Sequence, residues 1–202
     1  MRSNYFDKNA YNSVFQKMQY ENVLAMRVSL ETGLRIDDVL SLRPENLSKK
    51  SYIECTAKKT GKKATKKIST GLYTQLLKNS GNFWVFPSPK DERQHRTRQA
   101  VWVDIKKAGG WKGGLSPHSA RKTYAVEMMH DKGISAVQKE LQHSRLDTTM
   151  LYAFSDIMNG GERKKGEERK KIEITDNDLN KFAVIVAEKI IAYLKENLGK
   201  RL

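Results

Sequence analysis

The sequence predicts a mostly helical protein with one small antiparallel β-sheet, which is an α+β fold. Through most of the chain, apolar residues recur at a spacing of three and four, as they do on one face of an amphipathic helix. The exception is the stretch 51–69, where Thr60-Gly61 separates two short runs of strand character and indicates a hairpin. With 202 residues, the chain is long enough for one well-packed domain and a small appendage.

The helices are predicted from their apolar spacing and from the residues that end them. The first spans 12–31 and ends at Thr32-Gly33, and the second spans 36–42 and ends before Pro44. The strands are expected at 51–57 and 66–69, and the remaining helices of the core at 72–78, 97–108, 117–131, 134–141 and 147–154.

A few side chains are assigned to the core at this stage. In the helix at 97–108, the spacing turns Val101, Trp102 and Ile105 inward. Cys55 lies in the first strand and is expected to be buried filler. As the chain's one cysteine it cannot form an internal disulfide, and no Cys/His pattern has the spacing of a zinc site. The sequence therefore predicts no metal.

Composition changes after Ile157. The segment 159–171, NGGERKKGEERKK, has almost no apolar residue and is typical of a linker. We therefore expect a domain over 1–158, a charged flexible linker over 159–175 and a terminal amphipathic helix over 176–202. The apolar stripe of that helix consists of Leu179, Phe182, Val186, Ile190, Tyr193 and Leu194.

The charge balance indicates the kind of partner. The chain carries 38 lysines and arginines against 23 acidic residues, a net charge of +15, which suits a polyanion such as nucleic acid. The alternative is an ordinary basic surface. No apolar run approaches the ~18 residues that a membrane helix needs, and the N-terminus has no continuous apolar core of the secretory type. We therefore expect a cytoplasmic protein without a membrane partner.

Reactive and phosphate-binding side chains occur in a fixed order along the chain. Each motif is weak when taken singly, whereas the order and spacing together are specific. Tyr152, in the last motif, lies nine residues after His143. The motifs are Thr32-Gly33-Leu34-Arg35-Ile36 with Asp38 behind it, Lys59-Thr60-Gly61, His118-Ser119-Ala120-Arg121, Leu141-Gln142-His143-Ser144 and Thr148-Thr149-Met150-Leu151-Tyr152.

This set resembles the tyrosine recombinase family, which includes phage integrases, and the resemblance covers about residues 12–157. It implies the integrase catalytic-domain fold for the domain over 1–158. Two positions depart from the usual pattern: Gln142 stands where glycine is common, and Asp37 stands where a small or polar residue is common. Family members usually carry a core-binding domain before the catalytic one, so we expect a catalytic fragment or a minimal member. The catalytic residues implied are Arg35, Lys59, His118, Arg121, His143 and Tyr152, with Asp38 at the family's acidic position.

The chemistry of phosphodiester exchange explains the arginines and the tyrosine. Attack on a DNA phosphate builds negative charge on its non-bridging oxygens, and the guanidinium forks of Arg35 and Arg121 can hold those oxygens bidentately. The phenol of Tyr152, with a pKa near ~10, is a better leaving group than an aliphatic hydroxyl. A covalent link to it is therefore reversible.

The remaining roles concern protons and positioning. The resemblance implies that Lys59 protonates the leaving 5′-oxygen, although Lys58 and Lys62 are close rivals within a lysine-rich hairpin. His143 can donate to a non-bridging oxygen, and His118 can act as base on the phenol and assist Arg121. Asp38 would orient Arg35 or His118. No metal or other cofactor is required by this scheme, because side chains supply the cations.

Other functions remain open at this stage. Residues 134–153 can also be interpreted as a helix-turn-helix, with Tyr152 in its recognition helix, so a non-enzymatic DNA-binding protein or an inactive recombinase relative is the alternative. A relaxase similar to type IB topoisomerases would share the chemistry. The interpretation we favour is a site-specific recombinase on double-stranded DNA that works as a homo-oligomer, a tetramer on DNA. In that assembly the terminal helix packs either on its own domain or, as its charged tether favours, on a neighbouring protomer.

Overall fold

The computed structural model resolves the chain into two compact units, Met1–Ala125 and Val126–Leu202. In the part of the chain that the structure describes, no helix is long and apolar enough to cross a membrane. The predicted boundaries after residues 158 and 175 fall outside the described residues and stay predictions. The described residues are 8–47, 50–56, 61, 63–109, 114–132, 136–137, 140–141, 180 and 183–184.

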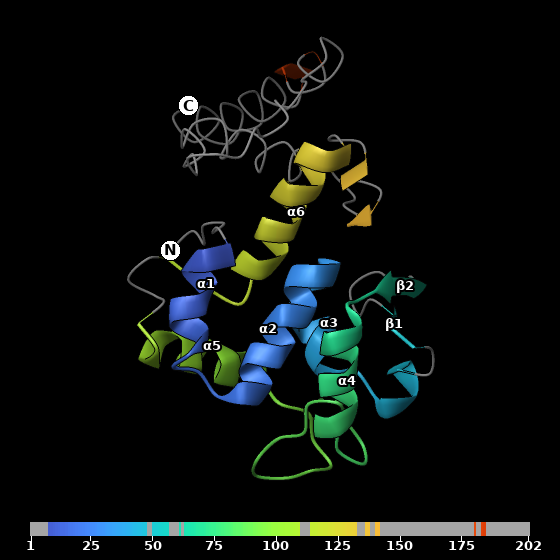
Figure 1. Cartoon of the computed structure of the whole chain (residues 1–202), viewed down its shortest axis with the longest axis vertical. Coiled ribbons are helices and arrows are strands. Elements are labelled where there is room, and N and C mark those ends of the chain that lie inside the picture. The colour runs from blue at the N-terminus through green and yellow to red at the C-terminus, as the bar shows by residue number, and fades with distance from the viewer. Residues whose placement is uncertain are drawn as a thin grey trace, which may run out of the picture. The chain divides into compact units, whose positions relative to one another are not determined.

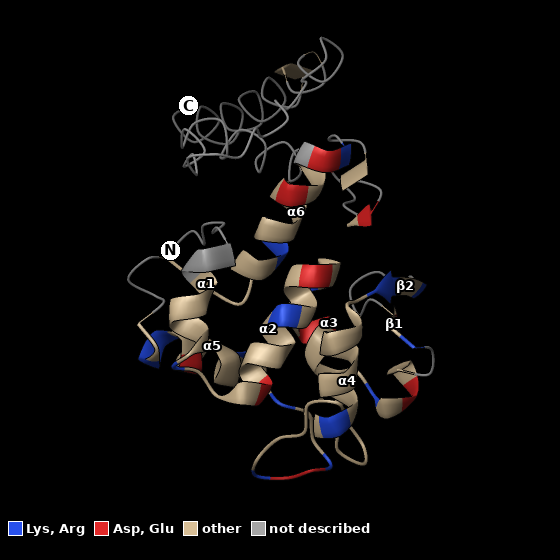
Figure 2. Cartoon of the chain, in the orientation of Figure 1, with Lys and Arg blue, Asp and Glu red and all other residues tan. Residues whose placement is uncertain are grey.

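Helix α2 (Tyr20–Thr32) is the central element of the first unit. In Figure 1 it runs between α1 (Lys8–Phe15) and α5 (Arg98–Lys107) on one side and α3 (Ile36–Leu40) and α4 (Thr70–Asn79) on the other. Its side chains are buried at five consecutive positions, from Asn22 to Met26, which requires neighbours on every face. The charged residues that it does carry are of both signs, as Figure 2 shows.

The prediction of one helix over 12–31 is wrong. The structure has two helices, and α1 ends at Phe15 while α2 begins at Tyr20. No glycine or proline lies between them. Instead, Gln19 has an extended ψ of 137°, and its backbone N–H donates to Asp104 Oδ2 at 2.8 Å. A partner 85 positions away in the sequence thus takes the donor that a continuous helix would use internally.

The predicted sheet is confirmed as a two-stranded antiparallel hairpin. Strand β1 (Tyr52–Thr56) pairs with β2 (Lys63–Lys67), in a register that runs from Tyr52↔Lys67 to Thr56↔Lys63. The second strand begins three residues earlier than expected, because its basic sequence KATKK hides its alternation. Figure 2 shows this basic strand. Cys55 is buried, as expected.

Two of the remaining helices begin at hydroxyl caps. In α4, Ser69 Oγ accepts from Leu72 N at 3.3 Å, and in α5, Thr97 Oγ1 accepts from Ala100 N at 3.1 Å. On α5, Val101 and Ile105 are buried as predicted. The inward assignment of Trp102 is wrong: its side chain is 40% exposed, and the ammonium of Lys106 lies 5.4 Å from its ring centroid.

The described part of the chain contains two further helices. A short 3₁₀ helix, Pro44–Leu47, follows α3, and the long helix α6 spans Ser119–Lys132 and contains most of the motif His118-Ser119-Ala120-Arg121. Beyond α6, the Leu141 N–H donates to the Val137 carbonyl at 2.9 Å, which is one helical turn inside the helix predicted over 134–141. The fold class is therefore confirmed, with short, mainly helical elements and one small sheet.

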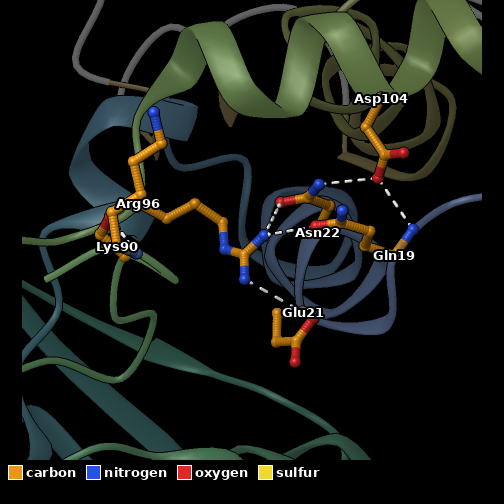
Figure 3. Close-up of polar contacts among 7 residues, drawn as sticks. Gln19, Glu21, Asn22, Lys90, Arg96 and Asp104 are labelled. Atoms are coloured by element: carbon orange, nitrogen blue, oxygen red, sulfur yellow. Dashed lines mark hydrogen bonds and ion pairs between the residues drawn. The ribbon is translucent and has the colours of Figure 1, made fainter. Parts of the chain in front are cut away.

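A buried arginine joins α2 to the loop that precedes α5 (Figure 3). Arg96 Nη1 donates to Gln19 Oε1 at 2.8 Å and to Asn22 Oδ1 at 3.2 Å, and Arg96 Nη2 lies 3.6 Å from Glu21 Oε2. The amide of Asn22 in turn donates to Asp104 Oδ2 at 2.7 Å. Among the buried side-chain nitrogen and oxygen atoms of the described residues, Arg96 Nε is the one without a hydrogen-bond partner. The start of α2 is thus fixed by polar contacts.

Replacing Arg96 by alanine is expected to lower the free energy of unfolding. The change leaves the buried oxygen of Asn22 without its donor, which costs about 1–3 kcal/mol, and it also removes packing. Arg96→Met keeps most of the volume and separates the two contributions. Urea denaturation of both variants measures the effect, and unchanged stability in both would show that the network is neutral.

Candidate active site

The first catalytic arginine of the predicted set follows a tightly held turn at the end of α2. Gly33 takes a left-handed conformation with φ of 68°, and its N–H donates to the Ser29 carbonyl at 2.9 Å. Ser29 Oγ donates to the Leu34 carbonyl at 2.7 Å, while Thr32 Oγ1 accepts from Leu34 N at 3.2 Å. The chain then turns extended at Arg35, which caps α3. Side chains of α2 therefore fix the backbone that presents Arg35.

The second arginine reaches this turn from far along the chain. Arg121, in the first turns of α6, is 8% exposed, and its Nη1 donates to the carbonyl of Gly33. Nearby on α6, the hydroxyls of Thr123 and Tyr11 hydrogen bond at 2.9 Å, which ties the helix to α1. The structure thus brings the guanidinium of Arg121 to the carbonyl of Gly33, two residues before Arg35 in the sequence. That the two arginines bind one phosphate stays a prediction.

His118 lies in the turn that opens α6, beside a cluster of charges. Its N–H donates to Ser116 Oγ at 3.2 Å, and its carbonyl accepts from Lys122 N at 3.2 Å. The ring stays accessible to solvent, yet partial burial lowers the pKa of His118 below its usual 6.5, and the Arg98 cation lowers this pKa further. Asp37 opposes both effects. The lowered pKa favours the neutral imidazole, which is the form that can accept a proton.

Asp38 is buried near the hairpin, where its side chain is 5% exposed. Burial raises the pKa of the Cys55 thiol, the Asp38 carboxylate raises this pKa further, and Lys66 lowers it. Asp38 therefore lies close enough to β1 to act on Cys55, a neighbour that the motif pattern did not indicate. Whether it orients Arg35 or His118 stays a prediction.

Three of the predicted catalytic residues, Lys59, His143 and Tyr152, lie outside the described residues, and their roles stay predictions. Lys59 falls in the connection between the paired ends Thr56 and Lys63 of the hairpin. In the described part of the chain, no group of three or more His, Cys, Asp or Glu side chains is placed to hold a metal ion.

Replacing Gly33 by alanine is expected to lower the free energy of unfolding by about 1–2 kcal/mol, because a side chain disfavours the left-handed conformation. The change also strains the carbonyl that receives Arg121. Gly71→Ala is the matched control: Gly71 lies in α4 with nothing within 4 Å of an added Cβ, so this change should leave stability equal or higher. Urea denaturation measures both, and equal effects at the two positions would contradict the role given to the turn.

Comparison with known proteins decides the family. The family model described as "Phage integrase family" matches residues 4–157, most of the chain. The chain belongs to this family. The predicted resemblance, expected over about residues 12–157, is therefore confirmed by a match that contains that span.

Individual relatives agree with the phage integrase assignment. Over 137 residues the chain is 34% identical to the tyrosine recombinase XerD of Vibrio cholerae, and this alignment covers 60% of this chain and 45% of the relative. Over 125 residues the chain is 30% identical to the integrase of Escherichia phage P2, and this alignment covers 61% of this chain and 35% of the relative. This integrase-family chain thus spans less than half the length of these curated relatives.

Solved structures share the fold of the integrase-family chain. A lambda integrase dimer bound to a COC′ core site aligns with a TM-score of 0.62 at 18% identity, over 87% of this chain and 64% of that one. The catalytic domain of bacteriophage HP1 integrase aligns with a TM-score of 0.55 at 20% identity, over 79% of this chain and 93% of that one. The predicted integrase catalytic-domain fold is therefore confirmed.

Proposed function

We propose that this protein is a site-specific DNA recombinase that cuts and rejoins double-stranded DNA through a 3′-phosphotyrosyl intermediate. The observation that carries the proposal is the hydrogen bond from Arg121 to the Gly33 carbonyl, which joins two motifs 88 residues apart. The bond places the Arg121 guanidinium at the turn that precedes Arg35, and two such groups are suited to a phosphodiester, because its non-bridging oxygens gain charge in the transition state.

In the proposed reaction, the phenolic oxygen of Tyr152 attacks the phosphorus of the scissile phosphate. The bond from phosphorus to the 5′-oxygen breaks, and Lys59 gives that oxygen a proton, which leaves a 5′-hydroxyl and a 3′-phosphotyrosyl link. His143 donates to a non-bridging oxygen alongside Arg35 and Arg121. The 5′-hydroxyl of a partner duplex then attacks the same phosphorus and releases Tyr152.

His118 is proposed as the base that accepts the phenolic proton of Tyr152. Its lowered pKa supports this role, since a neutral ring at pH 7 has a free nitrogen lone pair. The three cations around it, Arg98, Arg121 and Lys122, favour an approaching phosphate as well as a neutral imidazole.

The proposed partners are double-stranded DNA and further copies of this chain. The net charge of +15 supports the first. The similar lambda integrase has been solved as a dimer on a core site and as a tetramer on a Holliday junction, which supports a tetramer on DNA here. The terminal helix over 176–202 is proposed to contact a neighbouring protomer. A cytoplasmic location fits this activity, and no cofactor takes part in it.

The decisive experiment looks for the covalent intermediate. The protein is incubated with a labelled pool of nicked duplexes whose core sequence is randomised, and adducts are separated on a denaturing gel. We expect a protein–DNA adduct that survives detergent and disappears on protease treatment. Binding without any adduct would instead favour the non-enzymatic DNA-binding protein. Relaxation of supercoiled plasmid without paired sites would favour a relaxase.

A further inference from the structure

Two charged side chains outside the predicted catalytic set form an ion pair between α3 and α5. Arg98 Nη1 lies 3.7 Å from Asp37 Oδ2, and the side chains are 54% and 49% exposed. Asp37 is two residues beyond Arg35 in the sequence. Arg98 is the first residue of α5. Asp37 thus has a specific partner.

The contribution of this ion pair to the stability of the fold is too small to explain its presence. Ion pairs as exposed as Asp37–Arg98 add little to the free energy of folding, because water screens them and two long side chains lose freedom. Arg98 also stands at the N-terminus of α5, where the helix dipole disfavours a positive charge. The positive charge of Arg98 at this position is therefore slightly unfavourable for the stability of α5.

The pair adjoins the turn that Arg121 contacts, because Asp37 lies four residues after Gly33. Both charges of the pair also act on the imidazole of His118: Arg98 has the largest effect of the charged groups and Asp37 the next, ahead of Arg121 and Lys122. In the described part of the chain these groups come from three elements: α5 supplies Arg98, α3 supplies Asp37, and α6 supplies the other two. Arg98 and Asp37 act in opposite directions on the same ring, and each restrains the other's position.

We propose that Arg98 is a positioning residue of the His118–Arg121 site, that Asp37 holds it there, and that the pair fixes the charge surrounding His118. The catalytic part of this inference rests on the proposed function, whereas the charge relation among the three side chains does not. Arg98 acts on the reaction through His118.

The sign of each contribution follows from the charge. A fixed guanidinium disfavours the imidazolium, so Arg98 favours the neutral ring that can accept the proton of Tyr152. Asp37 favours the imidazolium directly, while it also keeps Arg98 in place. Removal of Arg98 should therefore raise the pKa of His118. Removal of Asp37 should lower this pKa by a smaller amount, because the release of Arg98 partly offsets the loss of the negative charge.

The test is an NMR titration of the histidine rings in the folded protein. His118→Gln assigns the His118 signal among the four histidines. We expect Arg98→Gln to move the midpoint of His118 upward and Asp37→Asn to move it downward. Arg98→Lys, which keeps the charge, should stay close to the parent protein. Arg93→Gln is the matched control, since Arg93 is an exposed arginine of the loop before α5 and is not among the charges that act on His118.

The second measurement is the pH dependence of DNA cleavage. The acid limb of the rate profile should move with the His118 midpoint: to higher pH in Arg98→Gln and to lower pH in Asp37→Asn. If the midpoints move and no variant or parent cleaves DNA, the charge relation stands and the proposed function fails. If the parent cleaves DNA but the His118 midpoint is the same in Arg98→Gln, Asp37→Asn and Arg93→Gln, the inference is overturned and the proposed function stands.

Discussion

Replacement of Tyr152 by phenylalanine is expected to abolish the covalent protein–DNA adduct and to leave DNA affinity nearly unchanged. The variant keeps the ring and loses the hydroxyl, so no oxygen remains to form the phosphotyrosyl bond. Adduct formation on a trapped duplex measures the first effect, and an equilibrium binding assay at fixed salt concentration measures the second, since the affinity depends strongly on salt.

The matched control is Tyr20→Phe. Tyr20 is 46% exposed at the start of α2, so loss of its hydroxyl should leave adduct formation as it is in the parent protein. An adduct that persists in Tyr152→Phe would show that another residue is the nucleophile. The order of the motifs would then have been misinterpreted at its last step.

The second large effect is expected at Arg121. Arg121→Ala should slow single-turnover cleavage by about 10²–10³-fold, as the loss of one preorganised donor to a developing oxyanion commonly does. DNA affinity should fall far less, because many phosphate contacts share the binding. Arg121→Lys should also be slow, since an ammonium cannot reproduce the bidentate fork. Comparing the cleavage rate at saturating protein with the dissociation constant separates the two quantities.

Arg121 is buried, so its removal also affects the fold. The Gly33 carbonyl loses its donor, which is expected to cost about 1–3 kcal/mol of stability. Kinetics are therefore compared at a temperature where thermal melts show each variant to be folded. Arg93→Ala serves as the control for removing an exposed arginine. If Arg121→Ala loses affinity and cleavage in the same proportion, the residue acts in binding alone.

The sequence predicted those helices and strands that are determined by residues close to them in the chain. The α4 and α5 helices begin at Ser69 and Thr97, whose side chains cap them, and the hairpin turns at a glycine with φ of 65°. Such signals lie within a few residues of the element they determine, so the order of helices and strands could be deduced from the sequence.

Features that depend on distant contacts could not be deduced in this way. The break between α1 and α2 comes from Asp104, which accepts the Gln19 N–H from 85 residues away. Arg96 is buried although it lies in a polar stretch, because α2 supplies its acceptors. Trp102 shows the converse: its apolar character suggested the core, whereas it lies over Lys106 at the surface.

The residues of the candidate site likewise divide into those that sequence motifs indicated and those that only the folded structure reveals. The motifs indicated Arg35, His118 and Arg121, and the structure places the last of these against the turn before the first. Neither Arg98 nor its pairing with Asp37 belongs to a motif. The sequence contained no indication that Asp37 would face a cation, or of which cation it would be.

The contact from Arg121 to Gly33 also has a consequence for when the site forms. The two residues are 88 positions apart, and Tyr11 and Thr123, which hydrogen bond nearby, are 112 apart. At about 5–20 residues per second, the ribosome needs roughly 4–18 seconds to add 88 residues. Contacts of such long range also form slowly, because a long loop must close first. The turn that presents Arg35 is therefore made well before its arginine partner emerges, and a growing chain cannot assemble the pair until α6 has been synthesised.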